Sequence, residues 1–235
     1  MISVVIPIYN EKDSIEPLFS ELLPVMNALE VPYEVICVDD GSSDGSSDLL
    51  KNFSKSDAKI KHIKFKTNCG QTAAFDAGFR AAKGGIIITL DADLQNDPND
   101  IPKVIEALEH ADVACGWRWK RNDPVIKKIS SKIANGVRNW LNQEDIKDTG
   151  CSLKAFRRSV VERFKLYKGL HRFFPTLAKM EGFRVVEVKV NHRERQFGIS
   201  KYGVTNRIFR ALADAFAIRW MQKRIIRYEF EENIS

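Results

Sequence analysis

The sequence predicts an α/β fold in which a mostly parallel central sheet is covered by helices on both faces. Short apolar runs rich in β-branched residues alternate with longer segments whose apolar residues recur at helical spacing. Strands joined through helices cross over the sheet and run parallel. The 235 residues, of which 44% are hydrophobic, suffice for one large domain with a substantial core.

Strands and helices alternate most regularly in the first half of the chain. The first strand, 3–8, is followed by apolar residues at helical spacing through 15–23. The same unit then recurs, and a fifth strand closes the series. The further strands are expected at 34–38, 60–65, 86–90 and 112–115, with helices ending near Phe53 and Lys83 and a helix after Asp97-Pro98.

The second half is less regular and more basic. Residues 125–141 and 204–228 each combine apolar positions at helical spacing with Lys and Arg, which predicts two basic amphipathic helices. Strands are expected at 152–156 and 184–190, followed by an Arg-rich loop at 191–203. We expect residues 1–203 to form the domain, and 204–235 to form a membrane-surface helix with an acidic tail.

Distinctive polar clusters follow the first four expected strands. They are 7–11, 39–44, 68–71 and 91–95. Each alone is ordinary turn chemistry, because Asp-Gly and Asn-X-Gly sequences form turns readily. Ligands of parallel α/β sheets bind beyond the carboxyl ends of the strands, so four clusters at that edge favour one binding crevice.

Asp91, Asp93 and Gln95 are the most informative residues of the chain. On an extended chain, side chains two residues apart share one face, so all three can point at one ligand. Two carboxylates that close repel each other unless a cation lies between them, and Mg²⁺ is commonly bound by carboxylates together with substrate phosphates. An acidic turn in solvent remains the alternative for an isolated Asp-X-Asp.

The charge and the cysteines narrow the class of protein. A net charge of +6 favours an anionic partner, but no nucleic-acid reading motif accompanies the basic residues, so we expect no nucleic-acid binding. The four cysteines make no zinc pattern, which indicates reduced thiols. We find neither a signal peptide nor a long apolar span, and therefore expect a cytoplasmic protein that lies on a membrane without crossing it.

Seven motifs follow one another along the chain. They are Pro7-Ile-Tyr-Asn-Glu11, Asp39-Asp-Gly-Ser-Ser-Asp-Gly45, Asn68-X-Gly-Gln71, Asp91-Ala-Asp-Leu-Gln95, Gly116-Trp-Arg118, Asp148-Thr-Gly-Cys151 and Arg195-Gln-Phe-Gly-Ile-Ser-Lys-Tyr202. This ordered set resembles family 2 glycosyltransferases of the GT-A fold, and more narrowly the polyprenyl-phosphate glycosyltransferases of the dolichyl-phosphate mannosyltransferase type. The resemblance covers essentially the whole chain.

The resemblance implies a role for each of these motifs. It implies that Mg²⁺ or Mn²⁺ and the diphosphate are held by Asp91, Asp93 and Gln95, and that Asp148 and Arg195 also take part in catalysis. The base would be bordered by Pro7, Tyr9 and Glu11, with Val38 and either Asp39 or Asp40. The remaining substrate contacts implied are Asn68, Gln71 and Ala92, together with the phosphate-facing Arg118, Arg195 and Lys201.

The implied reaction is the inverting transfer of a sugar from a nucleotide-diphosphate sugar to a polyprenyl phosphate. Many members of this subgroup carry transmembrane helices after the catalytic domain, whereas this sequence runs to Ser235 through an acidic segment. We therefore expect the basic amphipathic helices to reach the membrane surface, although packing of both helices on the sheet remains open. A homo-oligomer or a separate membrane-protein partner also remains open.

Three alternative functions remain open. A family 2 transferase acting on a soluble or polymeric glycan hydroxyl would need a carboxylate base, for which Asp148 is the candidate. A Mg²⁺-dependent phosphohydrolase also uses Asp-X-Asp, but there the pair usually ends the first strand. A nucleotide-binding membrane adaptor would bind without turnover. The motifs identify neither the sugar, the base nor the lipid.

Overall fold

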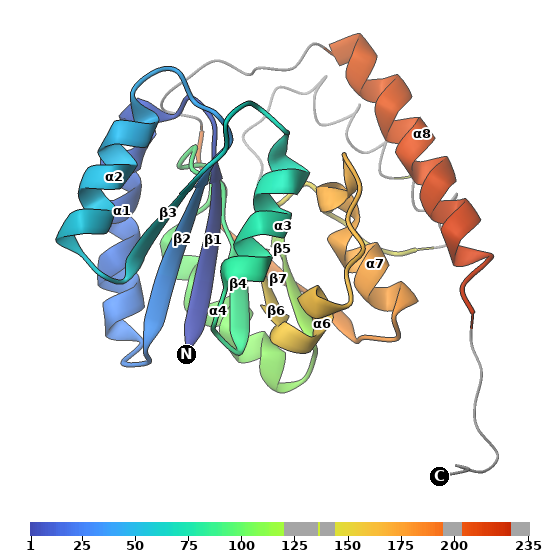
Figure 1. Cartoon of the computed structure of the whole chain (residues 1–235). Coiled ribbons are helices and arrows are strands. Elements are labelled where there is room, and N and C mark those ends of the chain that lie inside the picture. The colour runs from blue at the N-terminus through green and yellow to red at the C-terminus, as the bar shows by residue number, and fades with distance from the viewer. Residues whose placement is uncertain (120–135, 137–143, 195–203, 227–235) are drawn as a thin grey trace, which may run out of the picture.

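A seven-stranded sheet with the order β3-β2-β1-β4-β6-β5-β7 forms the centre of the molecule (Figure 1). The computed structural model describes residues 1–119, 136, 144–194 and 204–226, with side chains of the last helix described from residue 212. The strands are β1 (Ile2–Ile8), β2 (Tyr33–Asp39), β3 (Ile60–Lys64), β4 (Ile86–Thr89), β5 (Val113–Arg118), β6 (Lys154–Arg157) and β7 (Val185–Val190).

The sheet is mostly parallel, as the sequence predicts. β1 pairs in parallel with β2 and β4, β2 with β3, and β5 with β7. The exception is β6, which lies between β4 and β5 and pairs with both in antiparallel fashion. This insertion brings the segment before β6 to the same edge of the sheet as the carboxyl ends of β4 and β5.

The helices include all those expected in the first half of the chain. The helix expected after Asp97-Pro98 is broken into short pieces, because Pro98 and Pro102 each begin a new turn. The helical elements are α1 (Lys12–Ala28), α2 (Ser46–Ser56), α3 (Gln71–Ala81), η1 (Pro98–Asp100), α4 (Ile101–Glu106), η2 (Ala107–Glu109), α6 (Arg158–Glu162), η3 (Leu170–Phe173), α7 (Phe174–Met180) and α8 (Val204–Gln222).

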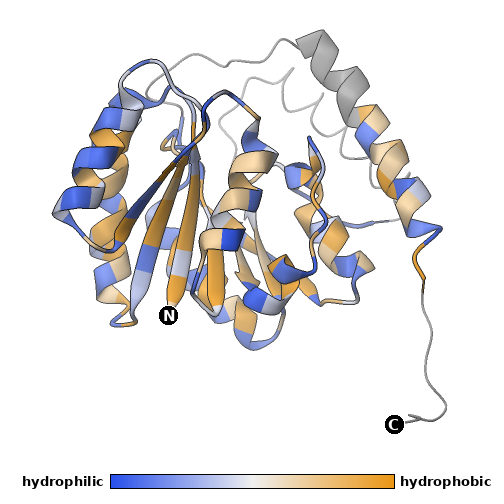
Figure 2. Cartoon of the chain, in the orientation of Figure 1, coloured by the Kyte–Doolittle hydropathy of each residue, from blue (hydrophilic) through white to orange (hydrophobic). Residues whose placement is uncertain are grey.

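Two hydrophobic clusters fill the space on either side of the sheet. Side chains alternate across each strand, so Val35 and Cys37 of β2 face one cluster and Ile36 and Val38 face the other. The first cluster packs against α1, α2 and α4, and the second against α3, α6 and α7. Figure 2 shows the resulting pattern, with hydrophobic strands between helices that are hydrophilic on their outer faces.

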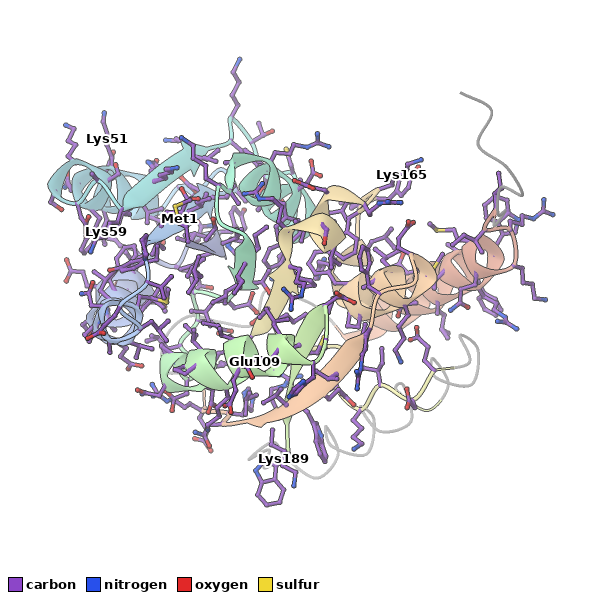
Figure 3. All side chains as sticks on the ribbon, turned by 90° about the horizontal axis from the view of Figure 1, so that it is seen from below. Met1, Lys51, Lys59, Glu109, Lys165 and Lys189 are labelled. Carbon is purple, nitrogen blue, oxygen red and sulfur yellow. The ribbon has the colours of Figure 1, made fainter. Side chains whose placement is uncertain are left out.

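The two edges of the sheet differ in chemistry. At the edge formed by the amino ends of the parallel strands, where Met1 lies (Figure 3), Ser3 Oγ donates to Glu34 Oε1 over 2.6 Å and accepts from Gly84 N over 2.8 Å. At the opposite edge lie the polar loops that follow β1, β2, β3 and β4. The four sequence clusters are therefore gathered at the carboxyl edge, as predicted.

Helix α8 both packs on the body and presents an outer face. Ala215 and Ile218 are buried in the second hydrophobic cluster, beside α7 (Figure 1), whereas Phe216 and Trp220 are 61% and 60% exposed. None of the helices that the structure describes is long and apolar enough to cross a membrane. The basic helix expected at 125–141 lies outside the described residues, apart from residue 136.

Candidate active site

The loops after β1 and β2 interlock. Asn10 N donates to Ser42 Oγ over 2.9 Å, Ser43 N donates to Asn10 Oδ1 over 2.8 Å, and Glu11 N donates to Ser46 Oγ over 3.1 Å. Asn10 adopts a left-handed conformation with φ of 52°, which Asn tolerates better than most residues. These bonds fix the two loops that the family resemblance assigns to the nucleotide base.

Asp40 and Asp39 differ in their surroundings. The Asp40 carboxylate accepts from Asn68 Nδ2, Cys69 N and Gly70 N over 2.9, 2.6 and 2.8 Å, so it holds the loop that leads into α3. Asp39 Oδ1 accepts from Ser42 N over 2.8 Å, while its buried Oδ2 has no hydrogen-bond partner among the described residues. Asp40 and Asn68 therefore pair with each other.

The acidic loop, defined as residues 91–95, is not extended. β4 ends at Thr89, and the chain bends through Ala92 to Leu94, where φ is 61°. We expected the alternation of an extended strand to place Asp91, Asp93 and Gln95 on one face. That expectation is wrong, because the chain bends within this loop. The bend itself places the first two carboxyl groups close enough for their charges to interact.

Asp91 is the strongly perturbed acid of this edge. Burial, and then the negative charge of Asp93, raise the pKa of Asp91 to about 6, against smaller opposing effects of Ser152, Lys154 and Arg118. Gln71 at the start of α3 donates its Nε2 to Asp91 Oδ1 over 2.8 Å. Asp91 is thus destabilised in its charged form by burial and by a neighbouring negative charge, and a bound divalent cation would relieve both effects.

The donor chemistry of the acidic loop suits Mg²⁺ or Mn²⁺. Asp91, Asp93 and Gln95 offer hard oxygen atoms, which these ions prefer. Within the described ranges, no group of three or more His, Cys, Asp or Glu side chains is arranged to hold a metal ion. Two carboxylates and an amide leave the remaining coordination positions to substrate phosphate or water, as is usual for Mg²⁺.

Arg118 and Asp148 form a partly buried ion pair with two hydrogen bonds. Arg118 Nε and Nη2 donate to Asp148 Oδ2 and Oδ1 over 2.7 and 2.8 Å. Backbone nitrogens add to this, because Arg118 N and Gly150 N donate to the same carboxylate over 3.2 and 3.1 Å. Asp148 N in turn donates to Glu187 Oε1 over 3.0 Å, so the pair is fixed between the end of β5 and β7.

The other predicted substrate residues are placed as follows. Pro7 of β1 lies opposite Val38 of β2, and Tyr9, which follows β1, is 37% exposed. Glu11 is half-buried next to the start of α1, and Ala92 is buried. Arg195 and Lys201 lie outside the described residues, so their phosphate contacts remain predictions.

Three residues at this edge were missed by the sequence reasoning. The Ser152 hydroxyl accepts hydrogen bonds from Asn96 and from Asp91 N of the acidic loop, and Lys154 is buried with its ammonium bonded to Cys151 O. Ser152 and Lys154 stand just beyond the Asp148-Thr-Gly-Cys151 motif, which is the one signal that could have drawn attention to them. Only the antiparallel insertion of β6 shows that they reach Asp91.

Comparison with models of protein families identifies the family of this chain. The model of glycosyl transferase family 2 matches residues 3–164, which include both interlocked loops, the acidic loop and the Arg118–Asp148 pair. This chain belongs to glycosyltransferase family 2. The resemblance deduced from the seven motifs is thereby confirmed at the level of the family.

Curated relatives of this family 2 chain include polyprenyl-phosphate sugar transferases. It is 39% identical over 210 residues to the undecaprenyl-phosphate 4-deoxy-4-formamido-L-arabinose transferase of Aeromonas hydrophila, covering 88% of this chain and 64% of the relative. It is 36% identical over 228 residues to the dodecaprenyl-phosphate galacturonate synthase of Rhizobium johnstonii, covering 94% and 67%. The chain thus spans about two thirds of the length of these relatives.

Solved structures confirm the GT-A fold. Glucosyl-3-phosphoglycerate synthase from Mycobacterium tuberculosis, in complex with Mn²⁺, UDP and glucosyl-3-phosphoglycerate, matches with a TM-score of 0.69 at 15% identity, covering 97% of this chain and 81% of that one. A mannosyltransferase from Pyrobaculum calidifontis, in complex with GDP-Man and Mn²⁺, matches with a TM-score of 0.64 at 20% identity, covering 94% and 63%.

Proposed function

We propose that this chain transfers a sugar from a nucleotide-diphosphate sugar to a polyprenyl phosphate, with inversion at the anomeric carbon and with Mg²⁺ or Mn²⁺ as cofactor. Membership of glycosyltransferase family 2 supports glycosyl transfer. The names of two curated relatives include a polyprenyl phosphate, which supports the acceptor. The complexes of two structural neighbours contain Mn²⁺ with a nucleoside diphosphate or a nucleotide sugar, which supports donor and metal.

The hydrogen bonding of Asp148 favours a phosphate acceptor over a hydroxyl acceptor. A hydroxyl acceptor needs a general base that takes its proton, and Asp148 is the candidate motif carboxylate for that task. Its two oxygen atoms already accept four hydrogen bonds, two of them from the Arg118 guanidinium. A carboxylate held in this way is a poor base, whereas an acceptor phosphate is already an anion and needs only to be positioned.

The chemical step then follows from charge placement. An oxygen of the acceptor phosphate bonds to the anomeric carbon while the bond from that carbon to the donor diphosphate breaks, and the bonding electrons leave with the diphosphate. A divalent cation held by Asp91, Asp93 and Gln95 would neutralise that leaving group. Gln71 orients Asp91, and Asp148 keeps the Arg118 guanidinium fixed where phosphate charge is to be met.

The nucleotide is proposed to bind over the interlocked loops. Pro7 and Val38 lie side by side on neighbouring strands, and Tyr9 follows β1 at the same edge of the sheet. Between the two candidate carboxylates we favour Asp39 for the base, because Asp40 is committed to the loop before α3. Asn68 then acts by holding that loop rather than by touching substrate.

The membrane surface is proposed to meet the outer face of α8. This face carries the exposed Phe216 and Trp220, Lys223 and Arg224 follow directly after the helix, and the Arg224 guanidinium carbon lies 5.1 Å from the centroid of the Trp220 ring. Aromatic side chains beside cationic ones suit an anionic lipid interface. All four cysteines are free thiols, which supports the cytoplasmic face, where thiols stay reduced.

The test is a transfer assay with matched acceptors. The purified chain is incubated with Mn²⁺, a panel of radiolabelled nucleotide sugars, and either undecaprenyl phosphate in detergent or soluble oligosaccharides. We expect label in the lipid extract for one donor and none on the oligosaccharides. Label on oligosaccharides alone would favour the hydroxyl-acceptor alternative, and nucleotide binding without any transfer would favour the adaptor.

A further inference from the structure

Ser152 occupies a junction between β4, β6 and the acidic loop. Thr89, the last residue of β4, donates its Oγ1 to the backbone oxygen of Ser152 over 2.6 Å. This bond fixes the position of Ser152 beside the end of β4. Because β6 is inserted next to β4, the side chain of Ser152 reaches the first residues after that strand.

The Ser152 hydroxyl connects the two ends of the acidic loop. Its Oγ accepts from Asp91 N over 3.2 Å and from Asn96 Nδ2 over 2.6 Å. A hydroxyl has two acceptor positions and one donor, so these bonds fill both acceptor positions and leave its proton to donate.

Between these two anchors the loop adopts a conformation that needs to be held. Leu94 has a φ of 61°, which is unfavourable for a residue with a branched side chain. The far anchor is itself secured, since Cys151 Sγ donates to Asn96 Oδ1 over 3.5 Å and Asn96 forms an antiparallel bridge with His192. Without the Ser152 hydroxyl, one residue at each end of the loop loses a hydrogen bond.

We infer that Ser152, acting with Asn96, is a positioning residue that holds Asp91 and Asp93 in the arrangement that binds the divalent cation. The inference rests on the proposed function, because it takes this pair as the metal ligands. Residues that orient metal ligands without touching the metal commonly change metal affinity or activity by 10-fold to 100-fold when they are replaced. Ser152 has that relation to Asp91 because its hydroxyl accepts a hydrogen bond from the backbone nitrogen of Asp91.

The test measures metal binding directly. Mn²⁺ binding is followed by electron paramagnetic resonance in the presence of uridine diphosphate and, separately, guanosine diphosphate, for wild type, Ser152→Ala and Ser152→Thr. We expect Ser152→Ala to weaken Mn²⁺ binding by about 10-fold to 100-fold. Ser152→Thr keeps the hydroxyl and is expected to recover most of the affinity. High Mn²⁺ should restore much of the transfer rate of Ser152→Ala.

The matched control is Ser3→Ala. Ser3 is also a serine with two hydrogen bonds, but it lies near the start of β1, at the opposite edge of the sheet. Its replacement is expected to lower the melting temperature while leaving Mn²⁺ affinity unchanged. If Ser152→Ala does not fold, Asn96→Ala removes one of the two donors and is expected to weaken Mn²⁺ binding as well.

The outcomes separate the inference from the proposed function. Wild-type Mn²⁺ affinity in folded Ser152→Ala, or in folded Asn96→Ala where the serine variant fails to fold, would overturn the positioning role alone. Absence of Mn²⁺ binding by wild type with either nucleotide would overturn the metal assignment and the inference with it. An equal loss of affinity in Ser3→Ala would show that general destabilisation is the cause, which also overturns the inference.

Discussion

Gln71 donates its side-chain amide to Oδ1 of Asp91 over 2.8 Å, which ties the first turn of α3 to the acidic loop. The same helix is reached through the loop that Asp40 holds by its carboxylate. The loop after β2, the start of α3 and the acidic loop are therefore connected by hydrogen bonds. A ligand that spans the nucleotide loops and the acidic loop would contact one connected structure.

Removal of either acidic charge should abolish most of the activity. We expect Asp91→Asn or Asp93→Asn to lower the transfer rate by at least about 100-fold, because the leaving diphosphate loses its charge stabilisation. The measurement is transfer of label to undecaprenyl phosphate, with circular dichroism as the check on folding. Full activity of the wild type in excess chelator would contradict this prediction.

Changes at Gln71 should act through Asp91. Gln71→Glu places a second carboxylate against Asp91, which raises the pKa of Asp91 further and should weaken Mn²⁺ binding at neutral pH. Gln71→Met removes the hydrogen bond without adding charge and should have the smaller effect. Titration of Mn²⁺ into both variants checks the order. Tighter binding by Gln71→Glu would instead indicate that the new carboxylate coordinates the metal.

The raised pKa of Asp91, about 6, predicts two pH effects. Mn²⁺ binding needs the ionised form, so the apparent affinity should fall about tenfold between pH 7 and pH 5. In the metal-free protein, the folded state holds its proton to a higher pH than the unfolded chain does. The protonated Asp91 therefore stabilises the folded state at low pH, and this contribution to the free energy of unfolding is lost as pH rises from about 4 to 6.

Thermal unfolding in chelator checks the second of these effects. The melting temperature of Asp91→Asn relative to wild type should increase as pH is raised from about 4 to 7, because only the wild type has to ionise a buried carboxyl group. A difference that does not depend on pH would contradict the raised pKa of Asp91.

The Arg118–Asp148 pair should position rather than deprotonate the acceptor. Asp148→Asn weakens a buried ion pair and is expected to lower the free energy of unfolding by about 3 kcal/mol. Transfer to undecaprenyl phosphate should fall mainly through a higher KM for the acceptor. Loss of kcat by 100-fold or more at unchanged KM would indicate a general base instead. Replacing both Arg118 and Asp148 by Ala should lower the free energy of unfolding by less than the sum of the two single replacements.

The outer face of α8 should bind anionic vesicles in a salt-sensitive way. Each basic side chain near such a surface contributes about 1 kcal/mol, screened over a Debye length. Charge reversal at Arg219, Lys223 and Arg224 should therefore release the protein from vesicles in cosedimentation while nucleotide binding is kept.

The matched control for α8 reverses three exposed lysines near the far end of the molecule, namely Lys51, Lys55 and Lys59, two of which are labelled in Figure 3. This variant carries the same change in net charge and should still sediment with vesicles. Equal release of both variants would show that only net charge matters, and release of neither would contradict the role of α8.

The sequence by itself determined the layered α/β fold and the edge at which the site lies. Short apolar runs rich in β-branched residues and helical spacing are local signals, so β1 to β4 and α1 to α3 could be placed within a few residues. The polar clusters after these strands had to meet, because parallel strands place their carboxyl ends at one edge. The order of the motifs was enough to predict the family.

Only the tertiary structure decided how the site is held together. Asp91 is bonded to Gln71 and Ser152, and Arg118 to Asp148, and each of these pairs joins residues from 20 to 61 positions apart. No local pattern encodes such contacts, because they depend on how distant segments pack, and the Asp91–Ser152 contact depends on β6 entering the sheet between β4 and β5 in the antiparallel direction. The bend at Leu94 and the two faces of α8 likewise became visible only in the folded chain.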